Sequence, residues 1–521
     1  MSGNVLQPKI FAILVTGLAL FSAITKSAEK QAEYHFSHEN ILGTSLDLRI
    51  QAESLEEART AEARILASIE RQSKIYSTYD SASELSRLQM KPIGEPVRSS
   101  TELRRLVRLS QKWNEQTAGA FDVRVERLSQ LWTKAAKLGQ LPAEAEIQAL
   151  VENNRKSCWL IDDSAKTIMR TGDAPITFNA IATGTIIDQA CLEVLSGNGA
   201  VSGVMIDIGG DIRVAGDMDT LIGVAHPQGT SENAAPLARL RLKNAAVTTS
   251  GDLYKGFVIG GRKFSHIIDP ATGRPVESVT SATVVAPTAE QADALATAFN
   301  VMPPEKSLAL AESIEGVACL LVTADGRLLV SKHWANFTYG TGGLGNLMAM
   351  AMTGLALPQK SGGKSDLLPL EVQFEINQPD ESRRYRRPYV AVWVEDAEGF
   401  SVRTLALWLQ AGGARWHPDL RRWYRDDQAR KLVDDTNLIA TMAKPTKAPG
   451  KYTVSWDGLD DAGLPVKPGT YTILIEAARE HGTYQLIRQE LTLGEKAMDK
   501  NLAGNVEIKS ARIVYGGSAA K

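Results

Sequence analysis

Apolar and polar residues follow two different periodicities near the start of the chain. Residues 38–52 alternate apolar and polar side chains as a half-buried strand does. Residues 54–76 instead carry apolar residues at helical spacing, and Ser54 with Glu57 forms a capping box at their start. A strand followed by a long helix is therefore expected here.

The same two periodicities continue between residues 100 and 330. A second helix is expected over Ser100 to Gln116, again opened by serine and glutamate. Between Met205 and Val330, short Val, Ile and Thr runs separated by Gly, Pro and Asp turns predict a sheet-rich region with one helix at 289–299. This part of the chain is expected to form an α+β domain.

The pattern changes after the first domain, which we place at residues 29–338. Residues 339–366 end in Gly, Ser and Lys and have the composition of a linker. Strict alternation with Pro and Gly turns then predicts an antiparallel Ig-like β-sandwich at 367–495, followed by a C-terminal tail at 496–521.

One motif in the linker has two interpretations. GTGGLG at 340–345 matches the glycine pattern of dinucleotide-binding loops. Such a loop needs a βαβ unit around it, whereas here a low-complexity stretch and a β-sandwich follow. An apolar hinge or docking segment is the favoured interpretation.

Composition narrows the class of protein. The 521 residues include 58 Lys and Arg against 60 Asp and Glu, a net charge of −2, and 44% are hydrophobic. These are the proportions of an ordinary soluble protein, without the basic surface that nucleic-acid binding requires. The three cysteines (Cys158, Cys191 and Cys319) are too scattered for a disulfide framework or a zinc site and are interpreted as small buried residues.

The N-terminus predicts export. Lys9 precedes an apolar run from Phe11 to Ile24, which is followed by small and polar residues, so residues 1–28 are expected to be a signal peptide. An uncleaved membrane anchor is the alternative. No cysteine stands near the end of the run, so a lipid anchor is not expected and the protein is expected free in the periplasm.

Asp293 and Thr297 are candidate metal ligands. They lie four residues apart on the helix expected at 289–299, so their oxygens project from one face. A carboxylate and a hydroxyl, completed by a backbone carbonyl and phosphate oxygens, suit Mg²⁺. A solvated helix face is the alternative, which the surrounding alanines disfavour.

His266 lies in SHIIDPATG, between an expected strand and a tight turn, where reactive groups are often held by a rigid scaffold. A structural turn with a satisfied histidine is the alternative. The turns SGD (250–252) and IGGD (208–211) bring backbone N–H groups and a carboxylate together, which suits phosphate or ribose contact.

Taken in order, these segments resemble the FAD:protein FMN transferases, the ApbE-like flavin transferase family. The resemblance covers about residues 35–338. Its motifs are ILGT, IYSTYDSASELSRL, TAGAFD, GTIID, IGGD, VTTSGD, HIIDPATGRP and ADALATA. It implies a mixed α/β fold that binds FAD and Mg²⁺ and transfers FMN to a Thr or Ser hydroxyl of a target redox protein in the periplasm or membrane, releasing AMP.

The resemblance also assigns roles to residues. Asp293 and Thr297 match the metal ligands, with the backbone carbonyl of Ala180 as a third, and His266 matches the base that activates the acceptor hydroxyl. The positions that match the FAD site are Leu42, Tyr79, Ala120, Phe121, Asp122 and Ile267. The rings of Tyr79 and Phe121 are expected to pack against a ring of FAD.

Four positions depart from the family pattern, and at two of them, Asn179 and Ala180, glycines are common in the family. Thr183 stands where a lysine usually contacts FAD, and Leu42 replaces the usual methionine. Because a threonine carries no charge, two alternatives to transfer stay open: hydrolysis of FAD to FMN and AMP, and a non-catalytic flavin-binding or interaction protein.

The C-terminal part resembles an uncharacterised periplasmic β-domain with an Ig-like sandwich. Its tryptophans, Trp393, Trp408, Trp416 and Trp423, are interpreted as core residues, with partner contacts as the alternative. The resemblance implies no catalysis. A docking role toward redox partners or acceptor proteins is the more specific hypothesis for this part.

Overall fold

The structure is a computed structural model of the chain. It describes residues 31–197, 199–225, 236–251, 256–339, 370–377, 387–409, 414–430, 443–444, 446–461, 465–479, 483–494 and 497–516. The expected signal peptide, nearly all of the expected linker, the GTGGLG motif and Asp252 of the SGD turn lie outside the described residues.

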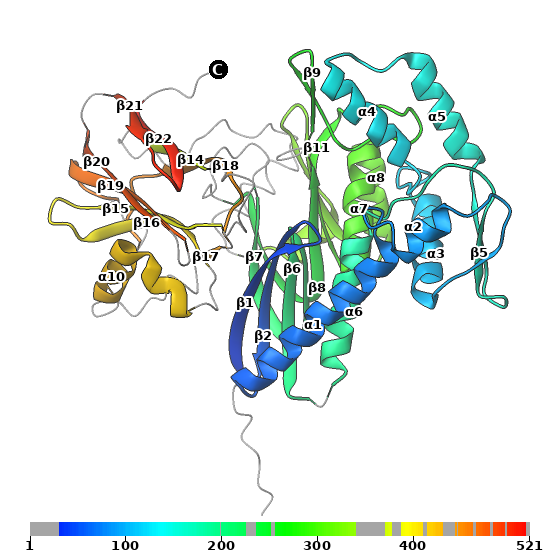
Figure 1. The fold of residues 1–521 in the computed structure, drawn as a ribbon, viewed down its shortest axis with the longest axis horizontal. Coiled ribbons are helices and arrows are strands. Elements are labelled where there is room, and N and C mark those ends of the chain that lie inside the picture. Colours follow the sequence, from blue (N-terminus) through cyan, green and yellow to red (C-terminus); the bar gives the residue numbers. More distant parts are fainter. Residues whose placement is uncertain are drawn as a thin grey trace, which may run out of the picture.

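An eight-stranded antiparallel sheet forms the centre of the first half of the chain (Figure 1). In spatial order its strands are β1 (Ala32–Ile41), β2 (Thr44–Ala52), β6 (Val201–Ile208), β7 (Asp211–Val224), β8 (Ala238–Gly251), β11 (Val279–Ala286), β12 (Ala318–Thr323) and β13 (Leu328–Val330). Leu46, Leu48 and Ile50 of β2 alternate with more exposed residues and are at most 1% exposed, as the sequence pattern predicts.

Helices cover one face of this sheet. They are α1 (Leu55–Tyr76), α6 (Ala182–Leu195), α7 (Ala289–Val301) and α8 (Pro304–Ser313) (Figure 1). The Ser54 hydroxyl accepts a hydrogen bond from the Glu57 N–H at 3.2 Å, which is the cap expected at the start of α1. The opposite face carries a second apolar cluster that includes Trp334 of the 3₁₀ helix η1 (Lys332–Asn336).

A smaller group of elements lies beside the sheet. It contains α2 (Glu84–Gln89), α3 (Thr101–Gln116), α4 (Glu126–Leu138) and α5 (Glu144–Lys156), a three-stranded sheet of β3 (Val97–Arg98), β5 (Thr167–Arg170) and β4 (Trp159–Asp162), and the hairpin of β9 (Phe257–Ile259) and β10 (Arg262–Phe264). Leu128 and Trp132 of α4 share an apolar cluster with Ile147 of α5 and Ile259 of β9, so α4, α5 and this hairpin pack as a unit. Buried residues of α2, α3, β4 and β5 belong instead to the main core cluster.

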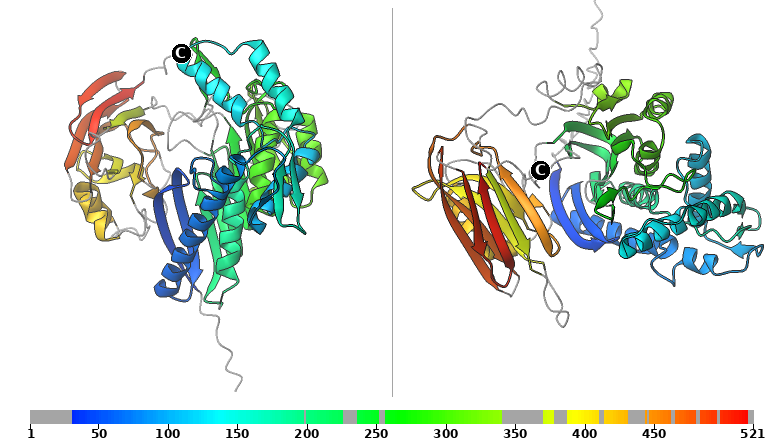
Figure 2. Two further views of the ribbon diagram at one scale, coloured as in Figure 1. Left: turned by 45° about the vertical axis from the view of Figure 1, so that its right-hand side comes forward. Right: turned by 90° about the horizontal axis from the view of Figure 1, so that it is seen from above.

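The C-terminal half forms a sandwich of two sheets (Figure 2). One sheet has the order β18 (Gly450–Trp456), β14 (Leu370–Ile376), β22 (Ile508–Tyr515) and β21 (Met498–Ala503). The other has the order β17 (Ala443–Lys444), β16 (Ser401–Trp408), β15 (Tyr389–Glu395), β19 (Gly469–Ala478) and β20 (Tyr484–Leu493). All described pairs are antiparallel except the short β16–β17 pair.

The α+β fold followed by an antiparallel sandwich is confirmed, and three details of the sequence interpretation are corrected. The sandwich does not end at residue 495, because β22 lies between β14 and β21 and buries Ile508, Ile513 and Tyr515. The expected tail therefore contains two strands, of which β22 belongs to the core. A 3₁₀ turn, η2 (Ala414–Asp419), and a helix, α10 (Arg421–Arg430), were not expected in this half. Cys158 is exposed, whereas Cys191 and Cys319 are buried.

Three of the four tryptophans are core residues, as the favoured interpretation holds. Trp393, Trp408 and Trp423 are each at most 2% exposed. The side chain of Trp416 lies outside the described residues. Among the described helices, none is both long and apolar enough to span a membrane.

Candidate functional site

Helices α6 and α7 approach each other closely where the candidate metal ligands lie. A Cβ atom at Gly184 of α6 would lie 2.3 Å from the carbonyl oxygen of Ala289, in the first turn of α7. Ala289, Asp293 and Thr297 follow one another at four-residue spacing along α7, so they form one stripe on its surface. Glycine at 184 lets this stripe pack against the backbone of α6.

Each helix accepts hydrogen bonds from the first turn of the other. Asp293 is 5% exposed, and its Oδ2 accepts the Gly184 N–H at 3.3 Å. In the opposite direction, the Asp188 carboxylate of α6 accepts the N–H groups of Ala289 and Glu290 at 3.0 and 2.9 Å. Burial raises the pKa of Asp188, and the two N–H groups oppose this shift by stabilising the carboxylate.

Thr297 connects α7 to the end of β8. Its Oγ1 lies 3.4 Å from the Oγ of Ser250, and the Asn300 side chain donates to the Ser250 carbonyl oxygen at 3.1 Å. Thr297 is half-buried, so its hydroxyl is held against the strand that leads into the SGD turn. Ser250 opens the SGD turn that the sequence analysis singled out, whereas Asn300 was given no role there.

Ala180 and Tyr79 lie near the start of α6. Ala180 is in the turn just before the helix, four residues ahead of the Gly184 N–H that Asp293 accepts. The neighbouring Asn179 donates from its side chain to the Tyr79 hydroxyl at 3.0 Å, which brings the loop after α1 beside this turn. The Tyr79 side chain is 85% exposed, so its ring is available to a ligand. Thr183 is in the first turn of α6 and is half-buried.

The TAGAFD loop is held rigidly after α3. The Thr117 hydroxyl accepts the Phe121 N–H at 3.0 Å, and the Asn114 side chain donates to the Phe121 carbonyl at 2.7 Å. The Phe121 ring is 1% exposed and lies in the main core, so it is not available to stack on a flavin or adenine ring. Of the two expected rings, only Tyr79 is exposed.

Asp122 and Ala120 flank this buried ring. The Asp122 carboxylate accepts two hydrogen bonds from the Arg124 guanidinium, at 2.8 and 2.6 Å, and Arg124 also donates to the Ser157 carbonyl. Asp122 is therefore engaged in an ion pair that orders the loop. Ala120 is partly exposed beside it.

His266 and Ile267 lie in a loop that is anchored to α4 and α5. The Trp132 indole of α4 donates to the Gly273 carbonyl at 2.9 Å, and a Cβ atom at Gly273 would lie 2.6 Å from Ile147 of α5. Ile267 is 7% exposed and its N–H donates to the Ser265 hydroxyl at 3.0 Å, whereas His266 is half-buried. The rigid anchor restricts how far the imidazole can move.

Leu42 lies at the end of the sheet in the β1–β2 turn. Its φ is 50° and that of Gly43 is 82°, which is the geometry of a tight type I′ hairpin and is unusual for leucine. The Leu42 side chain is 40% exposed. The Gly209 N–H donates to the Ser45 carbonyl at 3.1 Å, so the IGGD turn lies beside this hairpin.

In the IGGD turn, the carboxylate that accepts a backbone N–H is Asp207, which precedes the motif. Its Oδ1 accepts the Gly210 N–H at 2.9 Å. Burial raises the pKa of Asp207 to about 7, and the nearby carboxylates Asp47 and Asp211 add to the shift. The Gly210 N–H of the turn is therefore already bonded to a carboxylate of the protein.

Asp293 and Thr297 thus share one stripe of α7, and Asp293 contacts the first turn of α6, just after the turn that holds Ala180. Tyr79 is hydrogen-bonded to Asn179 in that same turn. The sequence analysis assigned no individual role to Asp188, Asn179 or Ser250, although Asp188 ends the GTIID motif and Ser250 opens the SGD turn. For Asp188, its place as the carboxylate at the end of the GTIID motif was the available signal.

The donor atoms fit a magnesium ion. The carboxylate of Asp293, the hydroxyl of Thr297 and the carbonyl of Ala180 are hard oxygen donors, and Mg²⁺ binds such atoms through one or two protein carboxylates together with phosphate oxygens. Within the described ranges, no group of three or more His, Cys, Asp and Glu side chains could hold a metal.

Comparison with known families covers both halves of the chain. A family model described as the ApbE family matches residues 42–321. A second model, described as a predicted periplasmic protein (DUF2271), matches residues 369–510. The boundaries of both matches lie close to the ends of the two structural units.

Curated relatives of the first half share one name. The FAD:protein FMN transferase of Vibrio cholerae is 29% identical over 327 residues, which is 60% of this chain and 93% of that protein. The FAD:protein FMN transferase of Haemophilus influenzae is 30% identical over 260 residues, which is 48% of this chain and 74% of that protein.

Solved structures show the same fold. The ApbE protein of Thermotoga maritima superposes with a TM-score of 0.53 at 29% identity, covering 59% of this chain and all of that one. The flavin transferase ApbE of Vibrio cholerae superposes with a TM-score of 0.50 at 25% identity, covering 59% of this chain and 99% of that one.

Proposed function

The chain belongs to the ApbE family and is a flavin transferase that uses FAD, and we propose that it transfers FMN, with Mg²⁺, to a threonine or serine hydroxyl of a periplasmic or membrane redox protein. AMP is the second product. The observation that supports this most directly is the α7 stripe, in which Asp293 accepts the Gly184 N–H at the start of α6 and Thr297 lies against Ser250 at the end of β8.

In this proposal the site has two functions, binding and proton transfer. Asp293, Thr297 and the Ala180 carbonyl would hold Mg²⁺, and the ion would supply charge neutralisation at the FAD pyrophosphate. The exposed Tyr79 ring packs against a ring of FAD. Leu42, Ala120, Asp122, Thr183 and Ile267 complete the proposed FAD site, while the buried Phe121 supports it through packing.

His266 is the proposed base. The acceptor hydroxyl oxygen attacks the phosphorus of the FMN moiety, the bond from that phosphorus to the bridging oxygen breaks, and AMP leaves with the bridging oxygen. The proton of the hydroxyl goes to the His266 imidazole. A histidine suits this step because its ordinary pKa lies near neutral pH.

The test is direct. Purified protein is incubated with FAD, Mg²⁺ and a flavin-accepting domain, and we expect AMP by chromatography and a covalently fluorescent acceptor on a denaturing gel. Asp293→Asn should lose at least a hundredfold in rate, because it removes a charged ligand. Asp173→Asn, which removes an exposed ion pair with Arg127, is the control and should retain activity.

Two outcomes would contradict the proposal. The absence of both AMP and labelled acceptor in the parent protein would refute transfer, and an unchanged rate in Asp293→Asn would refute the metal assignment. Incubation without acceptor tests the hydrolytic alternative, because AMP would then appear at an undiminished rate.

A periplasmic location is supported by the match of the C-terminal half to a predicted periplasmic family. We propose that residues 1–28 are the export signal, that residues 29–338 form the catalytic domain and that the sandwich docks redox partners or acceptor proteins. Mass spectrometry of the chain recovered from the periplasm should give a mature N-terminus near residue 29. A mature chain that still begins at Met1 would contradict the export signal.

A further inference from the structure

The first N–H groups of helix α7 donate hydrogen bonds to a side chain of α6. The Asp188 carboxylate uses one oxygen for the Ala289 N–H and the other for the Glu290 N–H, at 3.0 and 2.9 Å. Helix starts are usually capped by a residue just before the helix, and α7 has such a cap in Thr288, whose hydroxyl accepts the Gln291 N–H at 3.3 Å. Asp188 is therefore a second cap that comes from a different helix.

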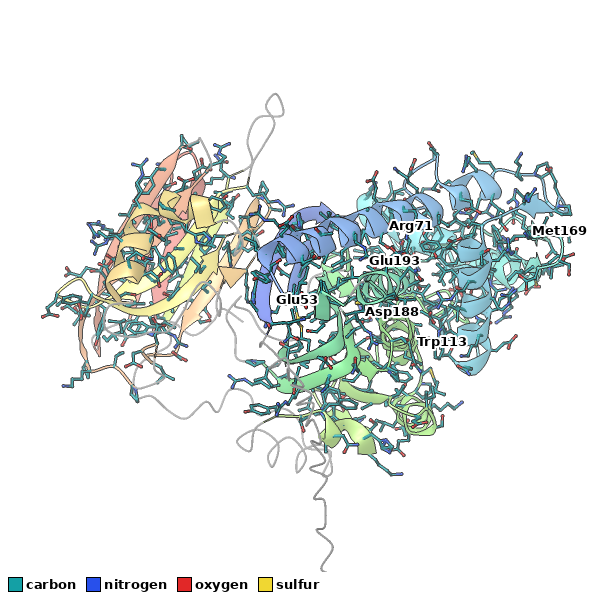
Figure 3. The ribbon with its side chains drawn as sticks, turned by 90° about the horizontal axis from the view of Figure 1, so that it is seen from below. Glu53, Arg71, Trp113, Met169, Asp188 and Glu193 are labelled. Carbon is teal, nitrogen blue, oxygen red and sulfur yellow. The ribbon has the colours of Figure 1, made fainter. Side chains whose placement is uncertain are left out.

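This second cap is supported from both sides. On the sheet side, Arg213 of β7 lies 3.4 Å from Asp188 Oδ1. On the α3 side, Arg105 donates to the buried Glu290 at 3.0 Å and Trp113 donates to the same carboxylate at 3.5 Å. Figure 3 shows Asp188 and Trp113 near one another in the helical layer.

The two hydrogen bonds from Ala289 and Glu290 to Asp188, called the clasp below, fix where α7 lies along α6. Gly184 and Asp188 are four residues apart and present one face of α6 to the first turn of α7. Asp293, one turn further along α7, accepts the Gly184 N–H in return. A change at Asp188 would let α7 slide or rotate, and Asp293 and Thr297 would move with it relative to the Ala180 carbonyl.

We propose that Asp188 is a positioning residue for magnesium: it fixes α7 against α6 so that Asp293 and Thr297 stand at the correct spacing from the Ala180 carbonyl. The inference rests on the proposed function, since it concerns the same metal site. Asp188 touches neither the substrate nor the metal in this arrangement and acts only through the α7 backbone.

A carboxylate is the group that this role requires. Its two oxygens accept two adjacent N–H groups at once, whereas an asparagine offers one acceptor oxygen and a donor that would face an N–H group. Negative charge is also favoured at a helix N-terminus. Asp188→Asn therefore weakens the clasp while nearly preserving the shape of the side chain.

The test measures metal binding apart from catalysis. Binding of Mn²⁺, used as a paramagnetic probe, is titrated by electron paramagnetic resonance on the full chain without FAD, and the Mg²⁺ concentration for half-maximal transfer is measured separately. We expect Asp188→Asn to raise both half-saturating concentrations about tenfold or more, as loss of a residue that orients metal ligands does. Activity at saturating Mg²⁺ should recover in large part.

Thr288→Ala is the matched control. It removes a cap from the same end of α7 but leaves the link to α6 intact, so it should lower the melting temperature without shifting either half-saturating concentration. If both variants shift Mn²⁺ binding equally, general loosening of α7 explains the effect and the inference is wrong.

The remaining outcomes are equally informative. Unchanged half-saturation in Asp188→Asn overturns the inference alone, whereas a parent chain that binds no Mn²⁺ and needs no Mg²⁺ overturns the metal part of the proposed function as well. If Asp188→Asn does not fold, Asp188→Glu keeps both oxygens and displaces them by one methylene. It should give a smaller rise in half-saturation, and no rise would refute the inference.

Discussion

At the scale of single residues, Gly184 shows how closely the candidate site depends on packing. A Cβ atom there would lie 2.3 Å from a backbone oxygen of α7 and 2.6 Å from the Glu290 nitrogen, and backbone atoms cannot move aside as a flexible side chain can. The substitution Gly184→Ala therefore has to separate the two helices.

We expect Gly184→Ala to lower the free energy of unfolding by about 1–3 kcal/mol, the usual cost of overpacking, measured by urea denaturation of the full chain. Gly197→Ala, just beyond the other end of α6, is the control. Its Cβ atom would lie 3.0 Å from the end of the flexible Arg64 side chain, which can move. Equal effects of the two substitutions would show that the α6–α7 approach is not tight.

His266 allows a second prediction at this scale. Replacement by glutamine keeps a polar side chain of similar size but removes the base, so we expect the turnover number to fall by about 10²–10⁴. FAD binding, measured by quenching of flavin fluorescence, should change little. A variant that keeps its turnover number would exclude His266 as the base.

The sequence indicated some site residues well and others poorly, for physical reasons. The shared stripe of Asp293 and Thr297 could be predicted because helical spacing alone puts them there, while their role as metal ligands stays a prediction. Burial of the Phe121 ring could not, because it depends on the packing of α3 against segments far away in the chain. The role of Asp188 depends on a helix that begins about a hundred residues later.

At the scale of elements, α10 is attached to the sandwich by buried charges. Glu476 of β19 accepts the N–H groups of Arg422 and Trp423, both at 2.8 Å, and so caps the helix. Arg422 forms ion pairs with Glu395 of β15 at 2.8 Å and with Asp426 at 3.1 Å. Burial, together with a hydrogen bond to Glu395, raises the pKa of Asp426 to about 7, and Arg422 opposes the shift.

This arrangement predicts that α10 is held more weakly as pH rises. The pKa of Asp426 is higher in the folded protein than in the unfolded chain. The stabilisation that this carboxyl group gives to the folded state is therefore fully present at low pH and is lost as pH rises toward about 7. The raised pKa of Glu476 acts in the same direction. At higher pH this stabilisation by Asp426 is absent.

Hydrogen exchange of the α10 amides checks this, with protection factors corrected for the intrinsic pH dependence of exchange. Protection should fall between pH 5 and pH 8 in the parent chain, and Asp426→Asn should reduce that fall. The exposed Glu490→Gln of β20 is the control and should leave it unchanged. Protection that rises with pH would contradict the assignment.

The pattern of this helix explains why the sequence did not predict it. Residues 421–430 read RRWYRDDQAR, in which charged residues outnumber apolar ones and no amphipathic stripe is visible. The helix forms because Trp423 is 2% exposed in a cluster with Trp393 and because Glu476 caps it. By contrast, β2 and α1 could be predicted, since their burial repeats at the period of the element itself.

At the scale of the whole molecule, the two halves have separate cores. The apolar clusters of the first half contain buried residues between Leu46 and Trp334, and those of the second half lie between Leu370 and Tyr515. Among the described residues no buried cluster member is shared between the halves. Separate cores are the condition under which two parts of a chain unfold independently.

We therefore expect two calorimetric transitions, of which only one responds to substrate. All the proposed FAD and Mg²⁺ ligands lie between Leu42 and Thr297, so FAD at a hundred times its dissociation constant should stabilise the first unit by about 2.7 kcal/mol. For a unit of this size, that corresponds to a shift of roughly 5 °C or more.

The assignment of the transitions can be checked with a point variant. Asp293→Asn should remove the Mg²⁺-dependent part of the shift and leave the other transition in place, because the second unit contributes no proposed ligand. A chain truncated after Tyr339 should retain the substrate-sensitive transition alone. If FAD and Mg²⁺ instead moved both transitions together, the sandwich would have to contact the ligand or the catalytic unit when substrate binds, and the separation of cores would not describe the working enzyme.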